Sequence, residues 1–138
     1  MRITRRLEID AGHRLQKHES KCRNLHGHRY AFEITIAAES LDEVGRVIDF
    51  GVVKDLVGGW LNDVLDHGFI LEKGDPILAW LETHDQKHYV MDGPPSIENL
   101  VKIVFENAKR LLEPKSVAVV HVRGYETPTS WADVGEDA

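Results

Sequence analysis

Two stretches of alternating apolar and polar residues constrain the fold of this chain more than any other feature. In residues 3–13 most of the alternate positions that begin at Ile3 are apolar, with Arg5 among them, and in residues 26–38 apolar side chains alternate from Tyr30 to Ile36. Such positions project from the same face of a strand, so each stretch is predicted to be a half-buried β-strand. Residues 14–25 between them are polar and basic, and we expect a long, ordered loop that joins two antiparallel strands. Loops of this length often have a function.

Two later segments repeat their apolar residues at the spacing of an amphipathic helix. The first follows Asp49, a predicted N-cap, and its apolar stripe consists of Phe50, Val53, Val57, Trp60, Leu61 and Val64. The second follows Ser96, and its apolar stripe consists of Leu100, Ile103, Val104, Ala108 and Leu111. A shorter helix is predicted to begin at Asp75 and Pro76, as N-cap and first helical residue, and to extend through Trp80.

The C-terminal part of the chain is predicted to return to β-structure. Residues 117–123 and 129–134 are predicted to be strands, residues 125–128 to turn between them, and residues 89–91 to be a further short strand. The order of elements predicts an α+β fold in which two long helices cover one face of a four-stranded antiparallel sheet. The other face of that sheet must then be solvated or meet another subunit.

Length and charge narrow the class of protein. The chain has 138 residues, which suits a single domain over residues 1–138. The net charge of -6 argues against a nucleic-acid-binding protein. The sequence has no apolar run near the roughly 18 residues of a membrane span. Its charged, alternating N-terminus is not typical of a signal peptide. We therefore expect a cytoplasmic protein that binds neither nucleic acid nor a membrane.

Three histidines fall on the apolar parity of the two N-terminal strands. His13 shares the parity of the apolar residues in the first strand, and His26 and His28 share that of the second. If the two strands pair as a hairpin, all three imidazoles lie at the same end and on the same face of the sheet. Three neutral imidazoles with an open position are typical of a catalytic zinc site, which polarises a bound oxygen and lowers its pKa. The alternative is that each histidine is an ordinary polar residue at the end of a sheet. Three histidines on the apolar parity of two neighbouring strands favour a metal site instead.

The single cysteine, Cys22, lies four residues before His26 in the basic loop. Positive neighbours and a nearby cation favour the thiolate form, which can act as a base or as a nucleophile. The alternative is an inert buried cysteine, which the polarity of the segment disfavours.

Two further sets of polar residues are weaker candidates. Asp66 is followed directly by His67, and a carboxylate can hold an imidazole in one tautomer so that it relays a proton. Adjacent residues do not always form such a bond, so the pair alone is more typical of a helix end. Glu126 lies in the segment YETPTSW, where its carboxylate could accept hydrogen bonds from a polar heterocycle. Spacing alone favours a solvated turn residue there.

Taken together, these motifs resemble those of the 6-pyruvoyltetrahydropterin synthase and 6-carboxytetrahydropterin synthase family. The resemblance covers nearly the whole chain, through the segments DAGHRL, CRNLHGHRY, VIDF, LDH, PPSIENL and YETPTSW. Each segment alone is unspecific, whereas their number and order are specific, and C-x-x-x-H-G-H is the strongest element. The four-residue step from Cys22 to His26 resembles the bacterial 6-carboxy branch, which belongs to the queuosine pathway.

The resemblance implies a role for each candidate residue. It implies zinc binding by His13, His26 and His28, proton abstraction by Cys22, a proton relay of Asp66 and His67, and anchoring of the pterin ring by Glu126. For the substrate's triphosphate, the candidates are the basic loop residues Arg14, Lys17, Lys21 and Arg23. Glu98 either touches the substrate of a neighbouring subunit or belongs to the helix cap. Family members assemble into oligomeric barrels with sites at subunit interfaces, so we expect a homo-oligomer, either a hexamer or a tetramer.

The function implied by the resemblance is that of a zinc-dependent 6-carboxy-5,6,7,8-tetrahydropterin synthase. Such an enzyme is a lyase that converts 7,8-dihydroneopterin triphosphate into 6-carboxytetrahydropterin, acetaldehyde and triphosphate, in the biosynthesis of queuosine or another deazapurine. The alternatives are a 6-pyruvoyltetrahydropterin synthase, a dihydroneopterin-cleaving variant, and a non-catalytic module that binds pterin or metal. Relatives of the cleaving type carry a Glu in or beside the Cys motif, and Leu25 before His26 argues against that branch.

Overall fold

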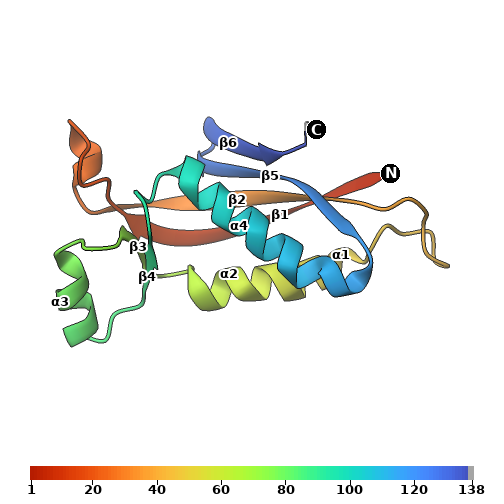
Figure 1. The fold of residues 1–138 in the computed structure, drawn as a ribbon, viewed down its shortest axis with the longest axis horizontal. Helices are drawn as coiled ribbons and strands as arrows, with labels where there is room; N and C mark the ends of the chain where they lie inside the picture. Colours follow the sequence, from red (N-terminus) through yellow and green to blue (C-terminus); the bar gives the residue numbers. More distant parts are fainter. Residues whose placement is uncertain (137–138) are drawn as a thin grey trace.

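The computed structural model describes residues 1–136, and the sheet at its centre is built on the two N-terminal strands. Strand β1 (Arg2–His13) pairs antiparallel with β2 (His26–Ala37) along its full length, from Arg2 opposite Ala37 to His13 opposite His26. β5 (Ala118–Thr127) continues the sheet beside β2, and β6 (Ser130–Gly135) lies beside β5, both antiparallel to their neighbours. The predicted pairing of the first two strands and the loop between them is confirmed (Figure 1).

The predicted number of strands was wrong. Within residues 1–136 the sheet has six strands in the order β4-β3-β1-β2-β5-β6. The additional strands are β3 (Phe69–Glu72), parallel to the end of β1, and β4 (His88–Met91), parallel to β3. β4 confirms the short strand predicted over residues 89–91, which was not counted in the sheet. Ile70 and Leu71 are both fully buried, so β3 is covered on both faces and lacks the alternation that marks a half-buried strand. The sheet is therefore mixed rather than purely antiparallel.

Two long helical segments cover one face of this sheet, as predicted (Figure 1). The first consists of α1 (Phe50–Val53), a π-helical turn η2 (Lys54–Gly58) and α2 (Gly59–Val64), and the second is α4 (Ile97–Leu112). Both predicted N-caps are confirmed, because the Asp49 carboxylate accepts the N–H of Gly51 and the Ser96 hydroxyl accepts the N–H of Asn99. Residues 1–136 also contain two short 3₁₀ turns: η1 (Lys21–Arg23) in the loop between β1 and β2, and η3 (Glu113–Lys115) directly after α4.

The π-helical turn adjusts the first segment to the core. The side chains that it buries lie strictly four residues apart: Val53, Val57, Leu61 and Leu65. Four residues exceed the 3.6 of one α-helical turn, so a strict four-residue repeat would drift around a regular α-helix. The wider π turn offsets this drift. Gly58 lies within it, and a Cβ there would be 3.5 Å from the side chain of Leu7.

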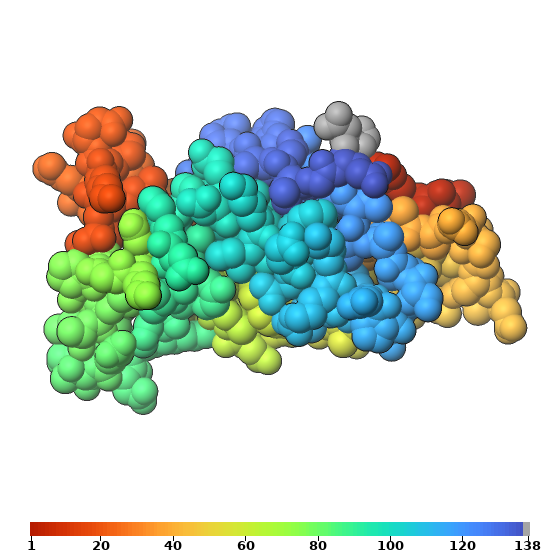
Figure 2. Space-filling model, in the orientation of Figure 1, coloured from red at the N-terminus to blue at the C-terminus, as the bar shows by residue number. Residues whose placement is uncertain are grey.

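A third helix, α3 (Ile77–Thr83), lies at the end of the molecule where β1 ends (Figure 1). It begins one residue later than predicted, and the Asp75 carboxylate accepts the N–H of Ile77. Asp75 also binds the guanidinium of Arg14 through two hydrogen bonds, one of them 2.8 Å long. This ion pair joins the start of α3 to the loop that follows β1. Figure 2 shows that loop, in orange, above the green α3 segment at the same end of the molecule.

The sheet face opposite the helices is polar and carries ladders of ion pairs. Arg6 bridges Glu8 and Glu33, Arg29 reaches Glu8 and Asp10, and Arg123 binds Asp133. Among residues 1–136, none of the helices is both long enough and apolar enough to cross a membrane.

Candidate metal centre

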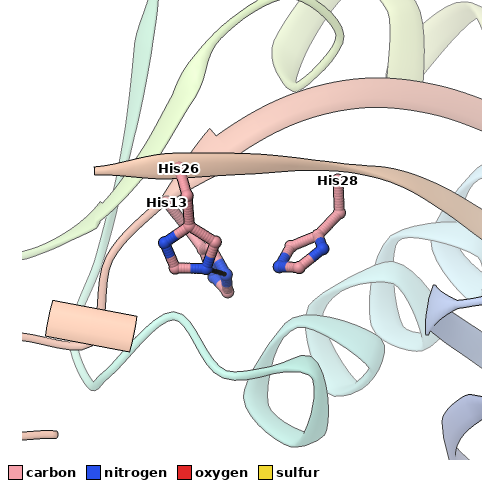
Figure 3. Close-up of side chains that lie close together, drawn as sticks. All are labelled: His13, His26 and His28. Atoms are coloured by element: carbon pink, nitrogen blue, oxygen red, sulfur yellow. Dashed lines mark hydrogen bonds between the residues drawn. The ribbon is translucent and has the colours of Figure 1, made fainter. Parts of the chain in front are cut away.

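The three predicted histidines meet beneath the ends of β1 and β2 (Figure 3). One ring nitrogen from each of His13, His26 and His28 lies within 4.8 Å of the other two. His13 and His26 are direct cross-strand partners, and His28 pairs with Ala11, so the strand register itself produces the cluster. The rings lie edge to face, with centroids 4.6 to 5.0 Å apart. The parity argument correctly predicted this arrangement.

Backbone carbonyls fix the tautomers of two of these rings. Nδ1 of His13 lies 2.8 Å from the carbonyl oxygen of Pro95, and Nδ1 of His26 lies 2.7 Å from that of Asn24. A carbonyl oxygen only accepts, so each Nδ1 carries the proton and each Nε2 presents a lone pair. The two Nε2 atoms nevertheless face one another at 3.1 Å. Two lone pairs at that distance repel unless a cation lies beside them.

The cluster fits a divalent metal ion better than a proton. Burial lowers the pKa of both His13 and His28, despite the opposing charge of Glu126, which disfavours protonation of these rings. Nε2 of His28 is buried and has no hydrogen-bond partner within residues 1–136. Neutral imidazoles that donate their other N–H to a carbonyl are the usual arrangement of metal ligands in proteins. The donor set is therefore suited to an ion such as Zn²⁺.

Glu126 approaches the same nitrogens from a third strand. Its Oε1 lies 3.5 Å from Nε2 of His13 and 3.7 Å from Nε2 of His28. The predicted turn over residues 125–128 was wrong, because β5 continues to Thr127. The register of β5 against β6 shifts between Tyr125 and Thr127, so Glu126 is the extra residue of a β-bulge. Alternation along β5 predicts only a strand end, and the bulge that positions this carboxylate leaves no clear sequence signal.

Cys22 lies in η1, within the loop that connects the two histidine-bearing strand ends. The N–H of Leu15 donates to the carbonyl of Cys22 at 2.8 Å, so the middle of the loop is tied back to the residue two positions after His13. The thiol is partly exposed, which differs from the alternative of an inert buried cysteine.

Asp66 and His67 form the predicted hydrogen bond but lie on the other face of the sheet. Nδ1 of His67 donates to the Asp66 carboxylate at 2.8 Å. The other oxygen of that carboxylate accepts the N–H of Asp10, whose side chain belongs to the polar face. Burial raises the pKa of Asp66, but these two hydrogen bonds outweigh it and lower the pKa below its ordinary value. The imidazole of His67 is 77% exposed. It lines a shallow pocket of about 410 Å³ with Gly12 and Gly27, and His28 is also part of the lining of this pocket.

The basic residues of the loop divide into two groups. Arg14, a candidate for phosphate binding, is engaged by the fully buried carboxylate of Asp75. That partner lies 61 positions away in the sequence, which local patterns do not predict. Lys17, Lys21 and Arg23 are exposed and form no ion pair within residues 1–136. Glu98 is exposed in the first turn of α4, where a negative charge stabilises the helix dipole.

One feature of the site was not predicted from the sequence. Pro95, whose carbonyl orients His13, immediately precedes the Ser96 cap of α4. The segment PPSIENL therefore starts a helix and also positions an imidazole. Backbone carbonyls have no side-chain signature, so only the proximity in the fold reveals this contact.

The chain matches the family described as 6-pyruvoyl tetrahydropterin synthase over residues 2–137. It is 42% identical to the 6-carboxy-5,6,7,8-tetrahydropterin synthase of Rickettsia bellii, over 97% of this chain and 99% of that protein. A protein of the same name from Aquifex aeolicus is 31% identical, over 98% of each chain. Among solved structures, an uncharacterized protein from Wolinella succinogenes has a TM-score of 0.85 at 22% identity, covering 99% of this chain and 98% of that one. The 6-pyruvoyl tetrahydropterin synthase of Caenorhabditis elegans has a TM-score of 0.72 at 22% identity, with coverage of 99% and 96%.

Proposed function

The chain belongs to the 6-pyruvoyl tetrahydropterin synthase family of enzymes, and we propose that it is a 6-carboxy-5,6,7,8-tetrahydropterin synthase. The proposed reaction converts 7,8-dihydroneopterin triphosphate and one molecule of water into 6-carboxytetrahydropterin, acetaldehyde and triphosphate, and it would supply the biosynthesis of queuosine or another deazapurine. The observation that carries this proposal is the 42% identity, over nearly the full length, to a relative with that name. In this proposal, residues 1–138 form one cytoplasmic catalytic domain.

The metal in this proposal is zinc, held by His13, His26 and His28. The support is the set of three convergent Nε2 atoms with two tautomers fixed by carbonyls. When bound, the ion would supply a Lewis acid that polarises the hydroxyl groups of the substrate side chain. The chain's own contribution is to hold the three rings in one orientation before the substrate arrives.

Cys22 is proposed to be the base that removes a proton from the substrate side chain. Support comes from its partly exposed thiol and from a loop that is tied to the end of β1. Lys17 and Arg23 in the same loop are proposed to bind the triphosphate, and Lys21 is a further candidate, because these cations are exposed and unpaired within residues 1–136. Glu126 is proposed to accept hydrogen bonds from the ring N–H and amino group of the pterin.

The proton relay of Asp66 and His67 is proposed to serve the metal centre of a second copy of the chain. Within one chain the relay faces the polar side of the sheet and the histidine cluster faces the helices. A site that uses both is therefore proposed to combine residues of two copies, which fits the proposed location of active sites at subunit interfaces. Glu98, exposed at the start of α4, is the candidate for contact with a neighbour's substrate.

Free sheet edges support assembly into an oligomeric barrel. β3 pairs with β1 only at Gly12 and His13, and Asp10 is bonded to Asp66 and His67, so residues 3–9 of β1 pair with no strand on that side within residues 1–136. β6 is the last strand at the opposite end of the sheet. Unpaired edges of this length are normally covered in natural proteins. Pairing of β1 with an edge of another copy would extend the sheet, and a closed ring of copies, a hexamer or a tetramer, would leave the ion-pair face inside.

Product analysis tests the proposed function. Purified protein is incubated with zinc and 7,8-dihydroneopterin triphosphate, and the products are separated by chromatography. Acetaldehyde and 6-carboxytetrahydropterin in equal amounts support the proposal. A 6-pyruvoyl product would identify a 6-pyruvoyltetrahydropterin synthase, 6-hydroxymethyl-dihydropterin would identify the cleaving variant, and binding without turnover would identify a non-catalytic module.

A further inference from the structure

The carboxylate of Glu126 lies close to two of the three histidines, His13 and His28, and makes no contact within 4.0 Å with His26. Zinc–nitrogen and zinc–oxygen bonds of roughly 2.0 to 2.1 Å in a tetrahedral site place neighbouring ligand atoms about 3.3 Å apart. The separation is 3.1 Å between the Nε2 atoms of His13 and His26. It is 3.5 Å from Oε1 of Glu126 to His13 and 3.7 Å to His28. The oxygen is therefore at ligand-to-ligand distance from two of the three imidazoles.

The surroundings of this carboxylate offer it no other partner. Within residues 1–136 it forms no hydrogen bond and no ion pair with any lysine or arginine. The atoms that it faces are the unprotonated Nε2 of His13 and the buried, unpartnered Nε2 of His28. A carboxylate oxygen opposite two lone pairs is a repulsive arrangement by itself. A divalent cation at the centre would convert all of these contacts into attractive ones.

The backbone also directs Glu126 toward the cluster. Gly124, two residues earlier in β5, faces the core, where a Cβ would be 3.1 Å from Val101 and 3.2 Å from Phe32. Glu126, the extra residue of the β-bulge, directs its carboxylate to that same face, where it meets His13 and His28. The side chain remains 27% exposed, so a ligand that enters the site can reach it.

We propose that Glu126 is a fourth metal ligand in the substrate-free protein. The same carboxylate then has two competing uses, because the proposed function assigns it to the pterin ring. The assignment of Glu126 as a metal ligand rests only on the geometry of the metal centre. The further step, in which the pterin draws Glu126 away from the metal, rests on the proposed function. Substrate binding would thus free a coordination position that the resting protein keeps closed.

Cobalt substitution tests the ligand assignment without turnover. The metal-free wild type, Glu126→Ala and Glu126→Gln are titrated with Co²⁺, and the visible absorption and the dissociation constant are measured. The expected result is an intense four-coordinate spectrum for the wild type. Glu126→Ala should give a weaker spectrum and raise the Kd for Co²⁺ by at least about tenfold. Removing a group that only supports a ligand already costs about tenfold or more in metal affinity, so removing a ligand should cost at least as much. Glu106→Gln removes an exposed carboxylate of α4 and should match the wild type.

Two outcomes would overturn the assignment. One is an equal spectrum and Kd in all variants that retain the wild-type circular dichroism. The other is a six-coordinate spectrum in the wild type. A second arm adds 7,8-dihydroneopterin to the cobalt protein and follows its binding by fluorescence. Binding with a spectral change supports release of Glu126, and binding without one contradicts release. Failure to bind would count against the proposed function and the release step, while the Kd comparison would still decide the ligand assignment.

Discussion

The carboxylate of Asp66 and the imidazole of His67 are adjacent in the chain and are joined side chain to side chain by a hydrogen bond of 2.8 Å. The backbone of His67 has a φ of 60°, and its N–H donates to the carbonyl of Asp10 at 2.7 Å. Both residues are therefore fixed against β1, while the imidazole itself remains exposed. The Asp66 carboxylate therefore holds the imidazole of His67 in one orientation, on the polar side of the sheet.

Asp66→Asn is expected to lower kcat by about 10²-fold or more, because an amide no longer fixes the tautomer of His67 that transfers a proton. Stability should change little, since the imidazole is exposed. Steady-state kinetics together with thermal unfolding measure the two effects. Asp63→Asn, an exposed change on α2, is the matched control. An unchanged kcat in Asp66→Asn would remove the relay from the mechanism.

Mixed oligomers test whether the site combines two chains. Cys22→Ala and His67→Ala should each be inactive, and refolding them together should restore activity, because one site in about four then contains both native residues. Refolding Cys22→Ala with His26→Ala should restore none, since these two residues would belong to the same half-site. Equal recovery in both mixtures, or in neither, would contradict an interface between two copies.

Removal of the metal is expected to abolish turnover without unfolding the protein. The core contains more than 20 buried residues from the sheet and both helical segments, and the histidine cluster lies at one end of it. Chelation should therefore leave the far-ultraviolet circular dichroism unchanged, and added Zn²⁺ should restore activity. Loss of the helical signal on chelation would instead indicate a purely structural zinc site.

Asp75→Asn is expected to lower the free energy of unfolding by about 2 kcal/mol, because it leaves the guanidinium of Arg14 without its charged partner. The hydrogen bond from Arg14 lowers the pKa of Asp75 below its ordinary value. The stabilisation is therefore complete above the unfolded pKa of about 3.9, and it is lost as the pH falls through the folded pKa. Denaturant unfolding between pH 2 and pH 7 checks this, and the variant should lack that acid-dependent part of its stability.

Tyr30→Phe is expected to leave the stability of the metal-free protein unchanged or to raise it by up to about 1 kcal/mol. The ring of Tyr30 is fully buried, and its hydroxyl has no hydrogen-bond partner within residues 1–136. Tyr125→Phe is the matched comparison, because that hydroxyl donates to Glu33 at 3.3 Å. It should lower the unfolding free energy by about 0.5 to 1 kcal/mol. A larger loss in Tyr30→Phe would mean that its hydroxyl has an essential partner.

The features that could be predicted from the sequence are those set by strand parity and by caps. The meeting of His13, His26 and His28 follows from alternation in two strands that pair as a hairpin, and Asp49 and Ser96 cap their helices through local bonds. Such signals depend only on residues that are close in the chain or directly opposite in a hairpin.

The features that could not be predicted depend on distant contacts or on irregular backbone. β3 consists of an apolar run without alternation, which fits a buried strand or a helix segment equally well. The capture of Arg14 by Asp75 joins residues 61 positions apart. The bulge at Glu126 and the side of the sheet on which His67 emerges are likewise properties of the assembled fold.

The π-helical turn at residues 54–58 sets the rotation with which the chain leaves its first long helix. If the same number of residues were wound as a regular α-helix, every later position would turn by about 100° around the helix axis. Leu61 and Leu65 would swing out of the core, and Asp66, which follows at once, would emerge at a different angle to Asp10. The π-helical turn therefore determines the direction in which the exposed imidazole of His67 leaves the helix.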